Sequence, residues 1–319
     1  GGGDTPSLGD PMVSPDNCTV AYTYIPDTGT TNYVQIIAAD DSALPVQIEN
    51  EPNNAGGGLE VSCQTVWSPN GQYILWASLE GALAANTGDT KLKRANADGS
   101  NVIDLFATPY VASPPVQQRV QGPLYSDDGT KILFYRDGTD GTGLVPTRRV
   151  YTIDADGTND TLVATYASNL SGGVGEPCFL AGTTTVVYWI PATGVYHIVE
   201  ADGTGDTVWF DDPDPFWGTT RMAALPNGSD FLALRFFPGD TAGQRFRVGY
   251  INSGGWTAFS PLRRSSGSSE KTRVPVLRQG RIWWADGYLD GVVSIATDGS
   301  DYTVEDNNQV IRGWFGQYV

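Results

Sequence analysis

The sequence predicts an all-β fold, a six-bladed β-propeller of four-stranded antiparallel blades. Two observations carry this prediction. Two kinds of tight turn recur along the 319 residues, and short runs of β-branched and aromatic residues separate them. Two hairpin turns in each period mean four short strands in each repeat, and such repeats are typical of propellers. We therefore expect a single closed domain with almost no helix.

The first turn has the form Ser-Pro-Asn-Gly and is expected to join the first two strands of a blade. Its clear copies are residues 67–71, 125–129, 225–228 and 277–280, with weaker copies at 13–17 and 180–182. A β-rich run follows the turn at residues 73–76, 131–135, 186–190, 231–234 and 281–284. Asn, Asp and Gly favour tight turns, so each copy marks a hairpin.

The second turn has the form Ala-Asp-Gly-Ser or Ala-Asp-Gly-Thr and is expected to join the last two strands. Copies stand at residues 97–100, 155–158, 201–204 and 297–300, and residues 40–42 and 253–254 fill the two remaining places. Asp-Gly adopts positive φ at little cost, as a two-residue hairpin turn requires. Neighbouring copies lie 46 to 58 residues apart, with one double interval of 96, which gives six repeats.

The second repeat carries a family resemblance. Its residues Trp67-Ser68-Pro69-Asn70-Gly71-Gln72-Tyr73-Ile74-Leu75 and Ala97-Asp98-Gly99-Ser100-Asn101 resemble the propeller repeat of TolB and its relatives. The resemblance extends along nearly the whole chain, without the amino-terminal α/β domain of TolB itself. It implies a periplasmic or surface propeller, most often one that binds proteins. Such repeats also occur in lyases, lactonases and peptidases, so the function must come from the site.

On these repeats the chain divides into a flexible leader and one propeller. The leader is residues 1–10 and the propeller is residues 11–319. Ring closure removes exposed sheet edges, so residues 309–319 are expected to take part in it. The six blades are expected at about residues 11–50, 60–107, 119–165, 176–211, 221–260 and 272–308.

Composition restricts the partners and the location. The net charge of −17 repels phosphate backbones, which disfavours nucleic acid as a partner. No apolar run is long enough for a transmembrane segment. The Gly-rich start resembles the segment after the lipidated cysteine of bacterial lipoproteins, although an expression-tag remnant would read the same way. We expect an exported protein: periplasmic, an outer-surface lipoprotein, or secreted.

The tight turns all fall at one end of the blades, which we call the turn end. The long connections fall at the opposite end, the loop end, and a partner is expected there because rigid scaffolds concentrate function on such loops. These connections include residues 50–60, 78–91, 108–121, 137–149, 166–177, 211–221, 238–244 and 261–273.

The richest of these loops is residues 211–218, in which Asp214, Phe216 and Trp217 stand beside stiffening prolines. Such a loop can stack on a sugar ring or anchor in a protein interface. The competing interpretation is that both aromatic side chains pack beneath the loop as part of the core.

Basic residues form a second group of candidates. Arg263 and Arg264, with Lys271 and Arg273, form the densest basic cluster, and Arg148-Arg149 forms a smaller one. Arginine pairs hold carboxylates and sulfates, whereas a Ser/Gly-rich loop can also be an ordinary solvated one. Arg119, Glu176, Arg221 and Arg273, with Glu60, stand near the starts of inner strands and are expected at the channel mouth, in salt bridges or in catalysis.

No metal site and no catalytic residue is predicted. Residues 154–160 begin like a calcium loop, but Thr165 stands where an EF-hand requires Glu. His197 is the single histidine, which disfavours both a histidine-rich metal site and a serine triad. Calcium held by carboxylates stays open as a cofactor.

The favoured function is a non-catalytic binding or scaffold propeller of the bacterial envelope or cell surface, which presents its loop end to a protein or glycan. One alternative is a calcium-dependent propeller enzyme that acts on glycans or hydrolyses lactones. A further alternative is a structural subunit of a surface assembly.

Overall fold

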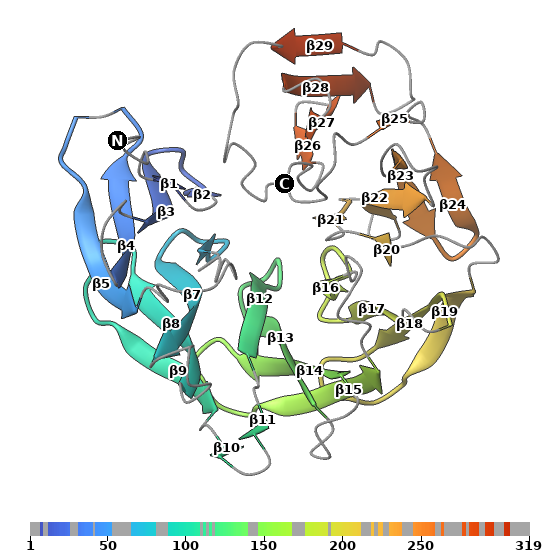
Figure 1. Cartoon of the computed structure of the whole chain (residues 1–319), viewed down its shortest axis with the longest axis horizontal. Coiled ribbons are helices and arrows are strands. Elements are labelled where there is room, and N and C mark those ends of the chain that lie inside the picture. Colours follow the sequence, from blue (N-terminus) through green and yellow to red (C-terminus); the bar gives the residue numbers. More distant parts are fainter. Residues whose placement is uncertain are drawn as a thin grey trace. The chain divides into compact units, whose positions relative to one another are not determined.

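The structure, a computed structural model, describes residues 7–8, 12–25, 31–40, 42–52, 65–80, 89–108, 111–112, 115–116, 119–139, 146–167, 176–190, 193–211, 218–219, 223–225, 230–237, 245–258, 263–264, 276–278, 281–286, 291–296 and 303–306. Every regular element in these ranges is a β-strand. The strands form six sheets of four or more strands and one two-stranded ribbon (Figure 1). The all-β class and the four-stranded antiparallel sheets are thus confirmed.

The described strands fall into two compact units, which divide between Thr165 and Tyr166, so that the last two residues of β15 (Thr161–Ala167) belong to the second unit. The first unit holds three sheets and the ribbon β10-β11. The sheets are β1-β3-β4-β5 with β2 also on β3, β6-β7-β8-β9, and β12-β13-β14-β15. The strand bounds are β1 Ser7–Leu8, β2 Met12–Val13, β3 Thr19–Ile25, β4 Thr31–Ala38, β5 Val46–Pro52, β6 Val66–Trp67, β7 Tyr73–Glu80, β8 Asp89–Asn96, β9 Ile103–Thr108, β10 Val111–Ala112, β11 Pro115–Val116, β12 Arg119–Tyr125, β13 Lys131–Thr139, β14 Pro146–Asp154 and β15 Thr161–Ala167.

The second unit holds the fourth, fifth and sixth sheets. They are β16-β17-β18-β19, then β20-β22-β23-β24 with β21 on β22 and β25 on β23, then β26-β27-β28-β29. The strand bounds are β16 Cys178–Phe179, β17 Val186–Ile190, β18 Val195–Val199, β19 Thr207–Asp211, β20 Gly218–Thr219, β21 Ala223–Ala224, β22 Phe231–Phe237, β23 Arg245–Asn252, β24 Gly255–Ala258, β25 Arg263–Arg264, β26 Val276–Arg278, β27 Arg281–Asp286, β28 Gly291–Ala296 and β29 Thr303–Asp306.

The leader is partly ordered in the first sheet. Residues 7–8 form β1, where Ser7 pairs with Ile25 and Leu8 pairs with Tyr24. The segment expected to close the ring, residues 309–319, lies outside the described residues.

The first turn signature is a repeated hydrogen-bonded unit between the first two strands of a sheet. In the second sheet, Ser68 Oγ donates to Asn70 Oδ1 at 2.8 Å and accepts the Tyr73 N–H at 2.9 Å. Ser126 and Asp128 repeat this arrangement in the third sheet, at 2.6 Å between Oγ and Oδ1. The side chains supply partners that the bent backbone lacks, which is why Ser and Asn or Asp occupy these positions.

The second turn signature is longer than the predicted two-residue turn. Between β8 and β9, Gly99 has φ +82° and donates its N–H to Asn96 O, and Asn101 also has positive φ, at +54°. The Asp98 carboxylate accepts both the N–H and the hydroxyl of Ser100, which extends the turn beyond the Asp-Gly pair. A β-turn followed by a left-handed glycine is a common hairpin connection of this length.

The core of the first unit lies between its sheets. Trp67, Ile74 and Trp76 pack with Met12 and Ala21 where the first and second sheets meet. Phe134 and Ile132 of the third sheet pack with Leu75, Leu92 and Leu105 of the second. Trp67 Nε1 donates to Met12 O at 2.9 Å, which gives the buried indole its partner.

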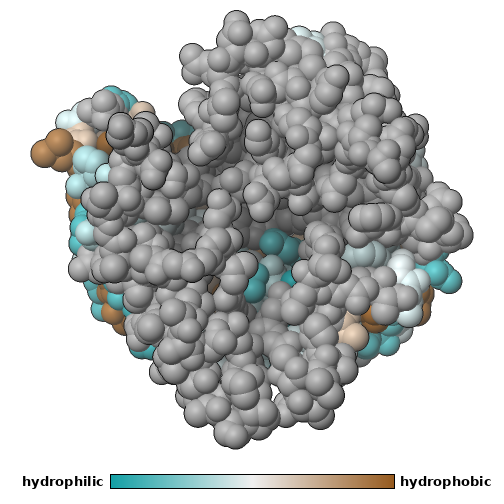
Figure 2. All heavy atoms as spheres, in the orientation of Figure 1, coloured by the Kyte–Doolittle hydropathy of each residue, from teal (hydrophilic) through white to brown (hydrophobic). Residues whose placement is uncertain are grey.

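The last strands of the sheets mix apolar and polar residues. Val46 in β5, Leu162 in β15 and Val208 in β19 are exposed among polar neighbours. Figure 2 shows described apolar residues in brown interspersed with hydrophilic residues in teal at the margins of the view. Single exposed apolar residues of this kind are ordinary on a protein surface.

Candidate functional site: arginines at the loop end

The structure describes four of the nine predicted binding residues. Arg119 is the first residue of β12, Glu176 is half-buried just before β16, and Arg263 and Arg264 form β25. The other five, Trp217, Phe216, Asp214, Arg221 and Arg273, lie outside the described residues.

The Ser/Gly-rich sequence around Arg263 and Arg264 favoured a loop, but these two residues lie in a strand. They form the two-residue strand β25, in which Arg264 pairs with Arg245 and Arg263 pairs with Phe246 of β23. Backbone pairing with β23 fixes their position at the loop end of the fifth sheet, because β23 begins there.

Charged residues alternate across the loop end of the third sheet. Arg119 of β12 is the cross-strand partner of Asp137 in β13, and Asp137 is the partner of Arg148 in β14. Arg148 is 3% exposed, and its guanidinium carbon lies 3.9 Å from the ring centroid of Tyr135. The predicted residues Arg119 and Arg148 therefore belong to one cross-strand row.

A second pair of arginines lies one residue along, on the opposite face of the same strands. Arg136 and Arg149 are direct cross-strand partners in β13 and β14. Arg136 is 9% exposed, and its guanidinium carbon lies 5.6 Å from the ring centroid of Phe106 and 5.3 Å from that of Tyr151. Its Nη1 donates to the Tyr151 hydroxyl at 3.3 Å. Aromatic faces thus hold this guanidinium in place.

Several buried donors at this pair have no hydrogen-bond partner among the described residues. They are Arg136 Nε and Arg149 Nη1, together with the Thr108 hydroxyl at the end of β9. Burial lowers the pKa of Arg136 below its ordinary value; the Arg149 charge adds to the lowering, and Tyr151 opposes it. The buried Arg136 and the half-buried Arg149 thus place two like charges side by side, an arrangement that a negative partner would stabilise.

The lysines of the neighbouring second sheet, unlike these arginines, form ion pairs with carboxylates. Lys93 Nζ lies 2.5 Å from Glu49 Oε1, and Lys91 Nζ lies 2.7 Å from Asp104 Oδ2. Within the described residues, no carboxylate forms an ion pair with Arg136 or Arg149. Among the side chains that the structure describes in these two sheets, Arg136 and Arg149 thus differ from Lys91 and Lys93 in having no carboxylate partner.

The register of the fifth sheet places arginines opposite one another in a similar way. Arg235 of β22 is the cross-strand partner of Arg247 in β23, and Arg245 is the partner of Arg264 in β25. Since alternate strand residues share a face, these four positions belong to one face of the sheet. Like charges at directly opposite positions destabilise a sheet. Cross-strand arginine positions nevertheless occur in both the third and the fifth sheets of this acidic chain.

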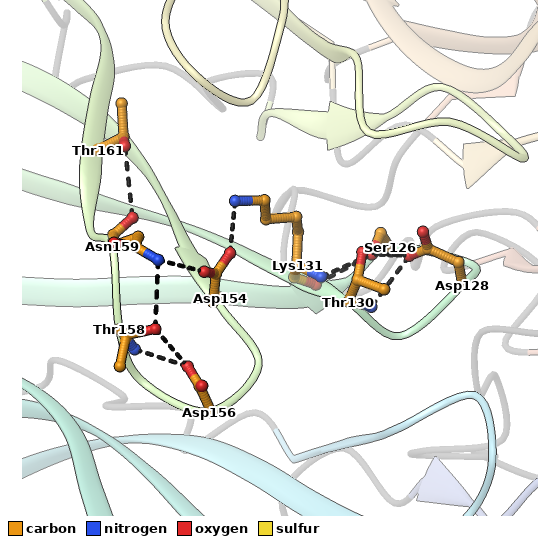
Figure 3. Close-up of polar contacts among 9 residues, drawn as sticks. All are labelled: Ser126, Asp128, Thr130, Lys131, Asp154, Asp156, Thr158, Asn159 and Thr161. Carbon is orange, nitrogen blue, oxygen red and sulfur yellow. Dashed lines mark hydrogen bonds and ion pairs between the residues drawn. The ribbon is translucent and has the colours of Figure 1, made fainter.

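The turn end is occupied by local hydrogen bonds instead. In Figure 3, Asp128 accepts from Ser126 and Thr130, and Asp156 accepts from Thr158. Asp154 joins Lys131 and Asn159, so both turns of the third sheet are bound into one polar network (Figure 3). These carboxylates already have partners within the protein.

The single histidine belongs to a small cluster in the fourth sheet. His197 Nδ1 lies 3.1 Å from Asp206 Oδ1, and the Tyr188 hydroxyl donates to Asp206 at 2.9 Å. Burial, then the bonded Asp206 carboxylate, raises the pKa of Tyr188 above its ordinary value. The Tyr188 ring also stacks on Tyr166 and His197. The cluster joins neighbouring strands, consistent with the expectation that His197 is a strand residue.

Among the described residues, no group of three or more His, Cys, Asp or Glu is placed to hold a metal ion. No helix formed by them is long and apolar enough to cross a membrane.

The sequence did not identify Arg136, Arg235, Arg245 and Arg247 as candidate binding residues. Each lies inside a strand, not in a loop, and becomes part of a cluster only through cross-strand pairing. One sequence feature could have indicated the Arg136–Arg149 pair. The two residues are equally many positions away from the centre of the connection between β13 and β14, as cross-strand partners in a hairpin are.

Comparison with models of known protein families finds no match, and comparison with curated protein sequences finds none either. Solved structures do share the fold. An oligogalacturonate lyase in complex with manganese is 10% identical with TM-score 0.63, over 94% of this chain and 78% of that one. The oligogalacturonate lyase of Vibrio parahaemolyticus is 10% identical with TM-score 0.61, over 92% of this chain and 76% of that one.

A putative TolB from Agrobacterium tumefaciens is 15% identical with TM-score 0.46, over 81% of this chain and 80% of that one. The fold shared with the two lyases is consistent with a propeller. At these identities the likeness concerns the fold alone.

Proposed function

We propose that this chain is an exported six-bladed propeller whose loop end binds a negatively charged partner, either a protein or a glycan. The observation that carries the proposal is the Arg136–Arg149 pair, in which buried donors lack a partner among the described residues. Six sequence repeats and six sheets of four or more strands support the blade number. The resemblance to envelope propellers supports a periplasmic, outer-surface lipoprotein or secreted location.

Charge at the loop end gives selectivity to such a partner. The chain as a whole carries −17, so acidic partners are repelled everywhere except where positive charge is concentrated. The arginines of the third sheet supply that concentration in the first unit, and the arginine positions of the fifth sheet repeat the pattern in the second unit. At the turn end, the Asp and Ser side chains are already bonded to one another and to the backbone.

Capture by immobilised protein tests this proposal. The parent, a Trp217→Ala variant and an Arg263→Ser/Arg264→Ser variant would be screened on an array that includes acidic glycans and against bacterial envelope extracts. Asn70→Ala and Asp156→Ala are matched turn-end controls. We expect the loop-end variants, the double arginine variant above all, to lose the captured partner. Loss in the turn-end variants alone, or capture of nothing by the parent, would contradict the proposal.

A glycan-active enzyme is the second candidate, and the fold shared with oligogalacturonate lyases favours it. In that case a divalent cation held by carboxylates would stabilise the folded chain by mass action. Thermal unfolding with added calcium or manganese, against magnesium and chelator controls, separates the two functions. A cation-dependent rise in Tm, with turnover of an acidic glycan, would favour the enzyme.

A further inference from the structure

We infer that Arg136, Arg149 and Thr108 form a binding site for a carboxylate group between the second and third sheets. The inference rests on the proposed function and deepens it, because it names the chemical group that the loop end recognises.

Register and hydrogen bonding place the three residues at one level of the contact between the sheets. The Thr90 hydroxyl accepts the Val120 N–H at 3.3 Å, which joins β8 to β12. Val120 is the cross-strand partner of Arg136, and Thr90 is the partner of Thr108. Arg136 also lies over Phe106, two residues before Thr108 on β9.

The donors at this level are buried and ready for a ligand. Arg136 Nε, Arg149 Nη1 and the Thr108 hydroxyl each lack a hydrogen-bond partner among the described residues. Arg136 cannot easily turn away, since Phe106 and Tyr151 lie against its guanidinium and Tyr151 accepts from its Nη1. A preformed set of donors loses little conformational entropy on binding.

The charge of the two arginines favours an anion over water as the ligand of this site. Water would satisfy the donors but would leave two neighbouring positive groups unneutralised in a partly buried place. Two guanidiniums with one hydroxyl suit a carboxylate, whose two oxygens accept about four hydrogen bonds in a plane. Sulfate and phosphate are larger and tetrahedral, and as more strongly hydrated anions they lose more hydration in a partly buried place, so they are expected to bind less well.

Thermal unfolding in different sodium salts tests the site. At pH 7 and constant ionic strength, replacing chloride with acetate is expected to raise the Tm of the parent by about 2 °C or more. Sulfate and phosphate also stabilise folded proteins in general, so the part of each rise that Arg149→Gln abolishes is compared, and this part is expected to be smaller in sulfate and phosphate. An absent rise in acetate would overturn the inference, and an equal Arg149-dependent rise in all three oxyanions would overturn the carboxylate assignment.

Two variants locate the effect. Arg149→Gln and Thr108→Val are expected to lose most of the acetate-dependent rise, because each removes one buried donor. Lys131→Gln is the matched control: it removes one positive charge from the turn end of the third sheet, and the rise should persist. If all three variants respond as the parent does, acetate acts elsewhere and the site is wrong.

A spectroscopic readout does not depend on variant stability. The Arg136 Nε–H resonance can be assigned from its disappearance in Arg136→Lys or, if that variant does not fold, in Arg136→Gln. We expect acetate to shift this resonance and chloride to leave it unmoved. An Nε–H that acetate does not move would overturn the inference.

Failure of this inference and failure of the proposed function give different results. If loop-end variants lose a captured partner but acetate has no effect on the parent, the proposed function stands and the carboxylate site is wrong. If acetate stabilises the parent through Arg149 but no partner is captured, the site stands and the proposed function is wrong.

Discussion

Arg136 and Arg149 are direct cross-strand partners at the loop end of the third sheet, and no carboxylate of the described residues forms an ion pair with either. Their contacts differ. Arg136 lies against two aromatic rings, whereas the contribution of Arg149 to this pair is mainly its charge. The two side chains should therefore affect stability in opposite directions.

In a buffer poor in oxyanions, Arg149→Gln is expected to raise the free energy of unfolding by about 0.2–1 kcal/mol, since it removes repulsion between like charges. Arg136→Gln is expected to lower it by about 1 kcal/mol, because the ring contacts are lost. Urea denaturation of both variants at low ionic strength measures this. Equal destabilisation by both substitutions would show that repulsion is unimportant here.

Gly122 is predicted to be far less tolerant of substitution than Gly182. Both have positive φ, at +57° and +70°. An added Cβ at Gly122 would clash with the Tyr135 ring, whereas an added Cβ at Gly182 would have no other residue's atom within 4 Å apart from its chain neighbours. We expect Gly182→Ala to cost about 1 kcal/mol from backbone strain, and Gly122→Ala about 2–4 kcal/mol from strain and overpacking together. Denaturant midpoints of the two variants compare these costs, and similar costs would argue against the packing of the Tyr135 ring on Gly122.

Trp76 is the largest fully buried side chain of the described core, at 0% exposure. Trp76→Ala is expected to lower the free energy of unfolding by about 3–5 kcal/mol, because it leaves a cavity between the first and second sheets. Leu162→Ala is the control, since Leu162 is 49% exposed and should change stability by less than about 0.5 kcal/mol. Comparable effects of the two substitutions would place Trp76 outside the core.

Acid is expected to weaken the turn end. The Ser100 hydroxyl and N–H lower the pKa of Asp98 below its ordinary 3.8, and those of Thr158 do the same for Asp156. A carboxylate whose folded-state pKa is depressed stabilises the fold above its unfolded value, and this stabilisation disappears as the pH falls through the folded value.

Asp156→Asn keeps a side-chain acceptor but cannot titrate. Its thermal stability should therefore fall less than that of the parent between about pH 5 and pH 2. Tm measured across this range tests the difference. Parallel curves for the two proteins would mean that the turn carboxylates contribute nothing to acid unfolding.

The turn residues made the order of the strands predictable from the sequence. The contacts between side chains on neighbouring strands were not predictable. The Ser68-Asn70 and Asp98-Ser100 hydrogen bonds are local, so a few residues determine each turn and the copies identify the hairpins. Arg136 meets Arg149 only through the register of a long hairpin. Residues 263–264 form a strand only because the first residues of β23 offer them backbone partners, after β24 has already paired with the end of that strand. Register depends on packing that no short pattern records.

Hydrogen–deuterium exchange of the parent, with and without a saturating captured partner, tests the central claim most directly. Binding at the loop end should slow exchange in peptides that contain residues 146–149, 245–247 or 263–264. Peptides with the turns at residues 68–72, 96–100, 126–130 and 154–158 should exchange at unchanged rates. Protection of those turns, with the arginine-bearing peptides unaffected, would contradict binding at the loop end.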